Sequence, residues 1–263
     1  MRKGKIGLVG AMAVVLALVF AGQGFAAEWP QVLEQVKAKY AKYTDDIKDL
    51  NMTQEMTTVS PEGNMVAQMT MLQKGKKFRS DSTMNMPGAP AEMGPMKTTI
   101  IFDGKDTWMI SSMMGKKKLP QKEGQEYQKD KNWWDFISEK AKITGTEKVG
   151  GRECYVVEME PQKDSAFTKL WLDMKNFVPM KMESKANKKD VMVMEFSELK
   201  KIKGGWEMPY KTTMFMNGKL VSTIVVKSLD VNKGVADDQF DAAKVPVDKK
   251  GFSMGNMMKE MMK

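Results

Sequence analysis

The chain contains no histidine and only one cysteine, Cys154, among its 263 residues. Histidine is the usual proton-exchanging side chain of catalysis near neutral pH, so triad chemistry and histidine-based acid–base chemistry are excluded. Structural and catalytic zinc sites are disfavoured for the same reason, because their ligands are mostly histidine and cysteine. A single cysteine also forms no internal disulfide. We therefore expect a protein that is not an enzyme and that has no cofactor and no resident metal.

Methionine, in contrast, is abundant, with 28 residues. Its unbranched thioether side chain adapts to neighbours of different shapes at little energetic cost. The formal net charge is +9, but the lysines are dispersed among acidic residues along the whole chain. A diffuse positive charge of this kind does not indicate nucleic acid as a partner. The composition therefore favours the binding of a hydrophobic ligand over catalysis.

The first residues have the pattern of a secretory signal peptide. Basic residues precede an apolar run over residues 6–20, and small residues lie at the expected cleavage site after Ala26. The apolar run is too short for a comfortable membrane span. We expect residues 1–26 to be a cleaved leader that directs the protein to a bacterial periplasm, residues 27–250 to form one domain, and residues 251–263 to form a methionine-rich amphipathic tail.

The spacing of apolar residues predicts two main helices and about ten strands. Apolar residues three and four positions apart over residues 29–43 predict an amphipathic helix, and bulky residues over 130–142 predict a second one. Elsewhere apolar and polar residues alternate between turn signals such as Asn217-Gly218. We expect a mainly β (α+β) fold, in which a large curved antiparallel sheet forms a half-open barrel with helices covering its concave face. A sandwich is the alternative.

Several short features follow one another along most of the chain. They are Gln54, the basic segment from Lys74 to Arg79, Asp103-Gly104 followed by Trp108, Leu170-Trp171-Leu172-Asp173 with Pro179 beyond it, and the closing Phe240 and Pro246. In this order they resemble the periplasmic outer-membrane lipoprotein-sorting proteins, the LolA-like and LolB-like carriers. The resemblance implies an unclosed barrel, lidded by helices, around an apolar cavity for acyl chains. It also implies lipoproteins or lipid acyl chains as ligands and envelope or outer-membrane proteins as partners; we expect a monomer.

The residues predicted to line this cavity are apolar side chains of the expected strands and aromatic side chains of the second helix. They are Met52, Met56, Met69, Met71, Phe78, Ile100, Phe102, Trp108, Trp133, Trp134, Phe136, Trp171, Met194, Phe196 and Met214. Burying one methylene group of an acyl chain contributes about 0.8 kcal/mol, so a lining of this kind needs no charged anchor.

Two alternative functions stay open. Thioethers are soft ligands that suit Cu(I), so the protein is alternatively a periplasmic copper-binding protein. Its candidate ligands are Met84 with Met86, Met93 with Met96, and the adjacent Met113 and Met114. The other alternative is an envelope-stress sensor module, which has the same fold and detects lipoproteins through its cavity. Methionines distributed over many strands favour the lipid hypothesis, because a metal site needs sulfurs that converge on one point.

Overall fold

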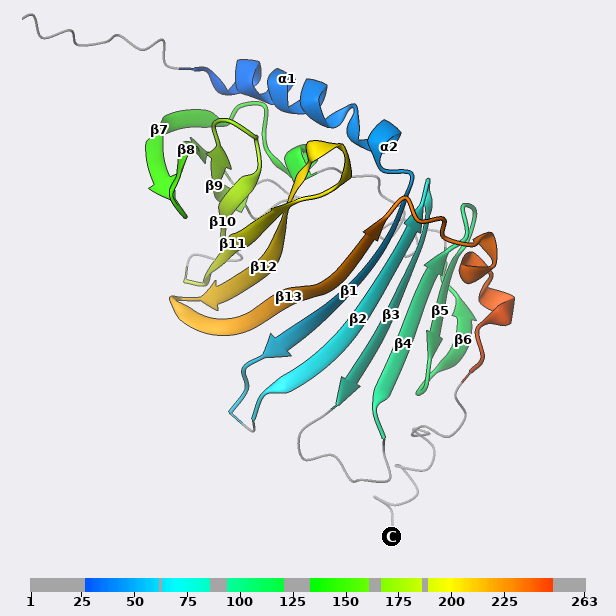
Figure 1. The fold of residues 1–263 in the computed structure, drawn as a ribbon. Coiled ribbons are helices and arrows are strands. Elements are labelled where there is room, and N and C mark those ends of the chain that lie inside the picture. The colour runs from blue at the N-terminus through cyan, green and yellow to red at the C-terminus, as the bar shows by residue number, and fades with distance from the viewer. Residues whose placement is uncertain are drawn as a thin grey trace, which may run out of the picture.

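The structure is a computed structural model and describes residues 27–61, 63–85, 94–120, 133–160, 167–185 and 189–247. These residues form one 13-stranded antiparallel sheet with a helix packed on one face (Figure 1). The mainly β fold with an open, curved sheet is therefore confirmed. The expected leader, the tail over residues 251–263 and most of the loop between Asn85 and Met96 lie outside the described residues.

The sheet contains strands of 4 to 13 residues. In chain order they are β1 (Asp49–Thr58), β2 (Met65–Lys74), β3 (Lys77–Asn85), β4 (Met96–Phe102), β5 (Thr107–Ser111), β6 (Gly115–Lys118), β7 (Lys142–Val149), β8 (Arg152–Glu158), β9 (Phe167–Asp173), β10 (Pro179–Lys185), β11 (Val191–Lys201), β12 (Glu207–Met216) and β13 (Lys219–Val231). The helices are α1 (Trp29–Tyr40), α2 (Tyr43–Asp46) and the short 3-10 helices η2 (Trp133–Phe136), η3 (Lys203–Gly205), η4 (Asp237–Phe240) and η5 (Ala242–Lys244).

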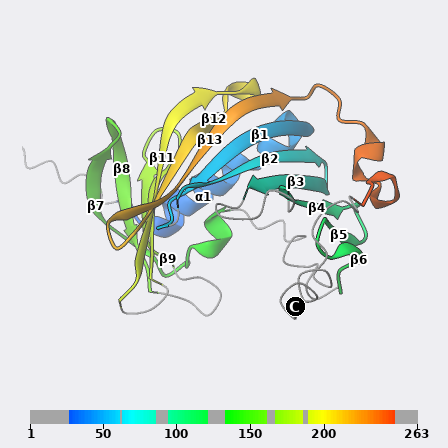
Figure 2. The same cartoon turned by 90° about the horizontal axis from the view of Figure 1, so that it is seen from below.

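The order of the strands places the first strand, β1, and the last strand, β13, side by side at the middle of the sheet. The order is β6-β5-β4-β3-β2-β1-β13-β12-β11-β10-β9-β8-β7. The chain runs outward from β1 to one edge, crosses to the opposite edge at β7, and returns strand by strand to β13, which pairs with β1. The sheet bends into an arch with α1 on its inner side and leaves the edges β6 and β7 unpaired within the described part of the chain (Figure 2).

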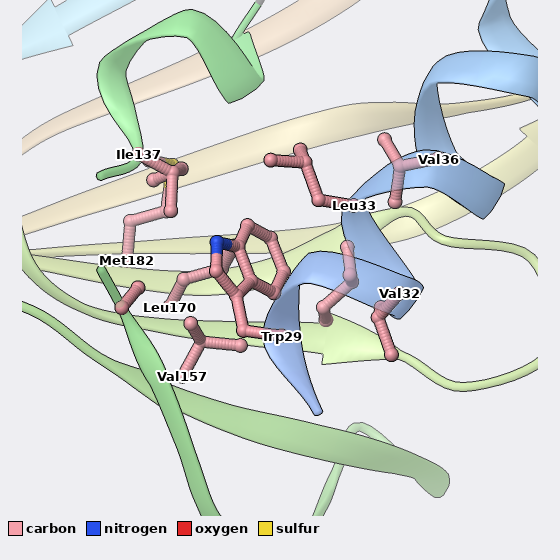
Figure 3. Close-up of a cluster of buried hydrophobic side chains, with 10 residues drawn as sticks. Trp29, Val32, Leu33, Val36, Ile137, Val157, Leu170 and Met182 are labelled. Carbon is pink, nitrogen blue, oxygen red and sulfur yellow. The ribbon is translucent and has the colours of Figure 1, made fainter. Parts of the chain in front are cut away.

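Helix α1 packs on the sheet through one apolar stripe, as its sequence predicts. Pro30 lies in the first turn, where its missing N–H leaves no hydrogen bond unmade. Trp29, Val32, Leu33 and Val36 are buried in a cluster with side chains from β8, β9 and β10 (Figure 3). The Trp29 Nε1 atom donates a hydrogen bond to the Ser138 carbonyl at 3.0 Å. The helix ends at Tyr40, and Tyr43 begins the separate short helix α2.

The prediction of a helix over residues 130–142 is wrong in its length. Of the described residues there, only Trp133–Phe136 are helical, and Lys142 already begins β7. The rings of Trp133 and Trp134 pack on Tyr40 of α1, at centroid distances of 6.0 and 5.0 Å. Aromatic residues are also only moderate helix formers, so these contacts decide the local conformation.

The C-terminal segment, residues 237–247 with η4 and η5, covers the outer face of the sheet at β4 and β5. Phe240, Ala242 and Val245 pack on Ile101 and Ile110 of β4 and β5, outside the arch (Figure 2). Arg79, Lys74 and Lys77 of β2 and β3 also bind this segment through polar contacts. Among the described residues, no helix is long and apolar enough to cross a membrane.

Candidate binding face

The pairing register shows which side chains share a face of the sheet. In an antiparallel sheet, directly paired residues point to the same side, and neighbours along one strand point to opposite sides. One row of paired residues crosses eight strands: Val157, Leu170, Met182, Met194, Met214, Ser222, Thr58 and Met65. Val157 and Leu170 are buried against α1. The whole row therefore lies on the side of the sheet that carries α1, which we call the concave face.

Methionine dominates this concave face. By register and packing, its methionines are Met52, Met56, Met65, Met69, Met71, Met84, Met96, Met109, Met182, Met192, Met194, Met208, Met214 and Met216. Several of them pair directly across neighbouring strands, as Met52 does with Met71 and Met182 does with Met194. The alternation of polar residues with methionine in the sequence thus produces one continuous thioether-rich surface.

The methionines of the concave face are only partly buried. Met52 and Met182 belong to apolar clusters and are buried, whereas Met56, Met69 and Met214 are half-buried and Met71 is 38% exposed. A filled core would leave each of them inaccessible. In the described part of the chain, the concave face therefore offers flexible apolar side chains that can gain further burial from a ligand.

The structure brings most of the predicted lining residues together. The ten that share the concave face are Met52, Met56, Met69, Met71, Phe78, Ile100, Phe102, Met194, Phe196 and Met214. Trp133 and Trp134 pack against the cluster under α1. The backbone of Phe136 ends η2, and its side chain lies outside the described part. Ligand binding by these residues stays a prediction.

Trp108 and Trp171 do not lie on the concave face, so the prediction that they line it is wrong. Trp108 pairs with Ile101 and packs in the cluster under the C-terminal segment. Trp171 packs with Cys154 on the outer face and donates a hydrogen bond from Nε1 to Glu147 at 2.6 Å. Trp171 lies between Leu170 and Leu172, and Trp108 is followed by Met109 and Ile110, so alternation alone does not reveal which way either tryptophan points.

A partly buried ion-pair network, where β8 and β12 begin and β9 ends, was not predicted from the sequence. The guanidinium of Arg152 donates to Asp173 at 2.9 Å and to Glu207 at 2.7 and 3.2 Å. The Asn176 amide donates to the same Glu207 carboxylate at 2.8 Å. The three charged residues are far apart in the chain, so no local sequence pattern predicts that they contact one another.

Electrostatics hold this network in its ionised form. The hydrogen bond from Arg152 lowers the pKa of Glu207, and Glu207 in turn raises the pKa of Arg152. Burial alone would raise the pKa of Asp173, but hydrogen bonds from the Asn176 backbone and from Arg152 outweigh it and lower that pKa. Together with Lys175 and Lys201, the network lines a cavity of about 540 Å³, and most of the lining residues are charged. This cavity is chemically unlike the concave face.

Two weakly acidic groups near the sheet are kept neutral. Burial raises the pKa of the Cys154 thiol to about 11 and that of the Tyr40 phenol to about 12. Cys154 is completely buried on the outer face, so its thiol is neither ionised at neutral pH nor accessible. These values give no sign of an activated nucleophile.

The methionines considered for copper are placed in three ways. Met84 and Met96 pair directly across β3 and β4 on the concave face. Met113 and Met114 lie in the turn between β5 and β6, where Met114 is 64% exposed. Met86 and Met93 lie outside the described residues. Within the described part, no group of three or more histidine, cysteine, aspartate or glutamate side chains is placed to hold a metal ion.

Comparison with solved structures finds proteins that are similar to this chain. A domain described as an outer membrane lipoprotein-sorting protein, from Vibrio parahaemolyticus, matches with a TM-score of 0.54 and 17% identity over 81% of this chain and 96% of its own. A DUF1329 family protein from Desulfovibrio piger matches with a TM-score of 0.56 and 15% identity over 82% and 99%. A LolA superfamily protein from Nitrosomonas europaea has a TM-score of 0.49 and 17% identity over 81% and 98%.

Comparison at the level of sequence gives less. A family model with the description "Uncharacterized protein" matches residues 135–246, which is less than half of the chain. No curated protein matches the chain. The identities of the structural neighbours are low, so they speak for the fold alone. The chain thus has the fold of the lipoprotein-sorting domain and of the DUF1329 protein, and the resemblance predicted from its sequence is confirmed at the level of the fold.

Proposed function

We propose that the protein is a non-enzymatic periplasmic carrier of lipid-like ligands, and that its cargo is the acyl chains of lipoproteins on their way to the outer membrane. The observation that supports this most directly is the concave face, where methionines of neighbouring strands form one half-buried apolar surface. The shared fold with a domain described as an outer membrane lipoprotein-sorting protein supports the same function.

The size of the hydrophobic effect makes this surface sufficient for binding. Each methylene group transferred from water contributes about 0.8 kcal/mol, so ten methylene groups supply about 8 kcal/mol before ordering costs are subtracted. The partly exposed thioethers of the protein lose contact with water at the same time. Because methionine repacks at low cost, one face accommodates acyl chains of different length.

The export signal and the chemistry of the chain agree with this proposal. The leader expected over residues 1–26 directs the protein to the periplasm, where lipoproteins pass between the two membranes. The chain has no histidine, and its one cysteine is buried with a raised pKa. The side chains most often used as catalytic bases or nucleophiles are therefore absent or buried, whereas reversible binding needs only the apolar face.

The test compares two neighbouring residues of β1 that point to opposite faces. Met56 lies on the concave face, and Thr57 lies on the outer face; both are half-buried. In the Met56→Glu variant, a charge would have to be desolvated by the acyl chain, so the affinity for a fluorescent long-chain fatty acid should fall at least about tenfold. The Thr57→Glu variant introduces the same charge one residue away and should bind as the wild type does.

The cargo itself is identified by extracting the protein, purified from its envelope fraction, with organic solvent and analysing the extract by mass spectrometry. We expect acylated species in the extract. The proposal fails if the extract contains no lipid and the wild-type protein gives no fluorescence response to the fatty acid. Equal losses in the Met56→Glu and Thr57→Glu variants would assign the effect to stability and not to the concave face.

A further inference from the structure

Four methionines of β11 and β12 occupy the corners of a rectangle on the concave face. Met192 pairs directly with Met216, and Met194 pairs directly with Met214. The sequence shows the same arrangement as two Met-x-Met segments, Met192-Val193-Met194 and Met214-Phe215-Met216. We call these four residues the methionine quartet. All four side chains are half-buried, and Met194 also packs against the cluster under α1.

The dimensions of a β-sheet bring the four sulfurs of the quartet within reach of one point. Paired residues have Cβ atoms about 5 Å apart, and residues two apart in one strand are separated by about 7 Å. The centre of such a rectangle lies about 4 Å from each corner, which is within the reach of a flexible methionine side chain. Four thioethers that project from one face of the sheet can thus converge above that centre.

The surroundings of the quartet suit a soft ion and not a hard one. Its paired neighbours on the same face are Met182 and Ser184 on β10 and Ser222 and Lys219 on β13. None of these four side chains is a carboxylate, which Mg²⁺ or Ca²⁺ would require. Soft thioether ligands select Cu(I) over such ions. Met182 adds a fifth thioether beside Met194, although it is itself buried under α1.

We propose that the methionine quartet is a binding site for one Cu(I) ion, held by the thioether sulfurs of Met192, Met194, Met214 and Met216. This activity goes beyond lipid carriage and uses only one end of the concave face. The pair Met84 and Met96 is a weaker candidate, because the next paired residues along β3 and β4 are Ser82 and Thr98. Met52 and Met71 pair beside Met69, but the fourth corner there is Gln54.

The lone cysteine does not compete for this ion. Cys154 lies on the outer face of β8, is fully buried and remains a thiol at neutral pH. Thioethers carry no proton that a metal must displace, unlike thiols, imidazoles and carboxylates. Binding by the quartet is therefore expected to be as strong at about pH 5 as at about pH 7, which a site built from protonated ligands would not be.

The experiment titrates the full chain with Cu(I) under anaerobic conditions, in competition with a colorimetric Cu(I) chelator. The quartet variant carries Met192→Leu, Met194→Leu, Met214→Leu and Met216→Leu, which keeps the face apolar and similar in volume. Its matched control carries Met52→Leu, Met56→Leu, Met69→Leu and Met71→Leu on the same face. We expect one tight Cu(I) site in the wild type and the control, and an affinity at least about a hundredfold lower in the quartet variant.

A second measurement locates the ion directly. In protein labelled with ¹³C in the methionine methyl groups, Ag(I), a redox-stable substitute for Cu(I), should shift four methyl resonances that are missing from the spectrum of the quartet variant. The proposal is overturned if no stoichiometric site is found, if the quartet variant binds as tightly as the control, or if the affinity falls steeply at the lower pH. Fatty-acid binding is measured separately on the wild-type protein, so a copper site without fatty-acid binding, or fatty-acid binding without a copper site, tells failure of one function from failure of the other.

Discussion

Arg152 is the residue on which the charge balance at one end of the sheet depends. It neutralises Asp173, whose side chain is only 4% exposed, and Glu207, which is 12% exposed. Removing one partner of a buried ion pair leaves an uncompensated charge in a medium that solvates it poorly. The Arg152→Met variant should therefore lower the free energy of unfolding by about 3 kcal/mol at neutral pH, as measured by urea denaturation.

The pH dependence of that loss has a definite sign. The pKa values of Asp173 and Glu207 are lowered in the folded protein, so both groups stabilise it above their unfolded pKa values of about 4, and this stabilisation disappears as the pH falls through the lowered values. The difference between wild type and Arg152→Met should shrink accordingly in acid. Lys227→Met removes an exposed ion pair with Glu55 and should cost much less, because solvent screens that pair. A difference that stays constant down to low pH would contradict this account of the network.

Gly204 and Gly205 form a matched pair for a second test at the scale of the residue. Both have a left-handed backbone, with φ of +77° and +78°. A Cβ atom at Gly204 would lie 2.9 Å from Trp206 Cδ1, whereas one at Gly205 would meet nothing within 4 Å. The indole cannot easily move aside, because Trp206 is buried and its Nε1 donates a hydrogen bond to Asp46 at 3.0 Å.

Gly205→Ala should therefore cost about 1 kcal/mol, the strain of the left-handed conformation alone. Gly204→Ala should cost about 2 kcal/mol more, because the steric conflict is added to the same strain. Thermal or urea denaturation of the two variants isolates the steric contribution as a difference. Equal losses would show that the loop before β12 relaxes freely around Trp206.

At the scale of elements, helix α1 acts as a fixed part of the core. Leu33 is 4% exposed in the cluster between the helix and the sheet, whereas Gln35 on the same helix is exposed. Leu33→Ala should lower the free energy of unfolding by about 3 kcal/mol, since it opens a cavity, and Gln35→Ala should change it by less than about 0.5 kcal/mol. If both substitutions have small effects, the helix is only loosely docked and can leave the concave face.

Elements with a strong local signal were predictable from the sequence. The stripe of α1 was clear because its apolar residues recur with helical spacing. The hairpin between β12 and β13 was clear because Asn217 and Gly218 adopt positive φ of 50° and 75°, which few other residue pairs tolerate. The alternation of methionine with polar residues indicated half-buried strands, because side chains of a strand point to its two faces in turn. The concave face contains most of the residues expected to line the binding site.

Elements and sites that depend on tertiary contacts were not predictable. The two tryptophans assigned to the wrong face, Trp108 and Trp171, lie in runs of consecutive apolar residues, where alternation gives no direction. The aromatic segment around Trp133 forms only one short helix, because its rings pack on Tyr40. The methionine quartet depends on the pairing register of β11 and β12. The alternation within each strand does not specify that register.

At the scale of the whole molecule, the central seam between β1 and β13 joins two halves that are each built from consecutive strands. The bond between the Lys48 amide and the Asn232 side chain spans 184 residues at this seam. A register shift at Thr53 and Gln54 keeps Met52 opposite Leu229 on the concave face. The alignment of the apolar side chains of the two halves on one face therefore depends on contacts between the first and the last strand.

A surface built from thioethers has a redox consequence that one built from leucine would not have. Oxidation converts methionine to its sulfoxide, which is polar and reversibly reduced by methionine sulfoxide reductases. Mild peroxide treatment should therefore abolish fatty-acid fluorescence while the sheet stays folded by circular dichroism, and reductase treatment should restore it. Unchanged fluorescence after peptide mapping has verified the sulfoxides would rule this out. If the concave face binds acyl chains as proposed, its half-buried sulfurs make that binding sensitive to oxidation.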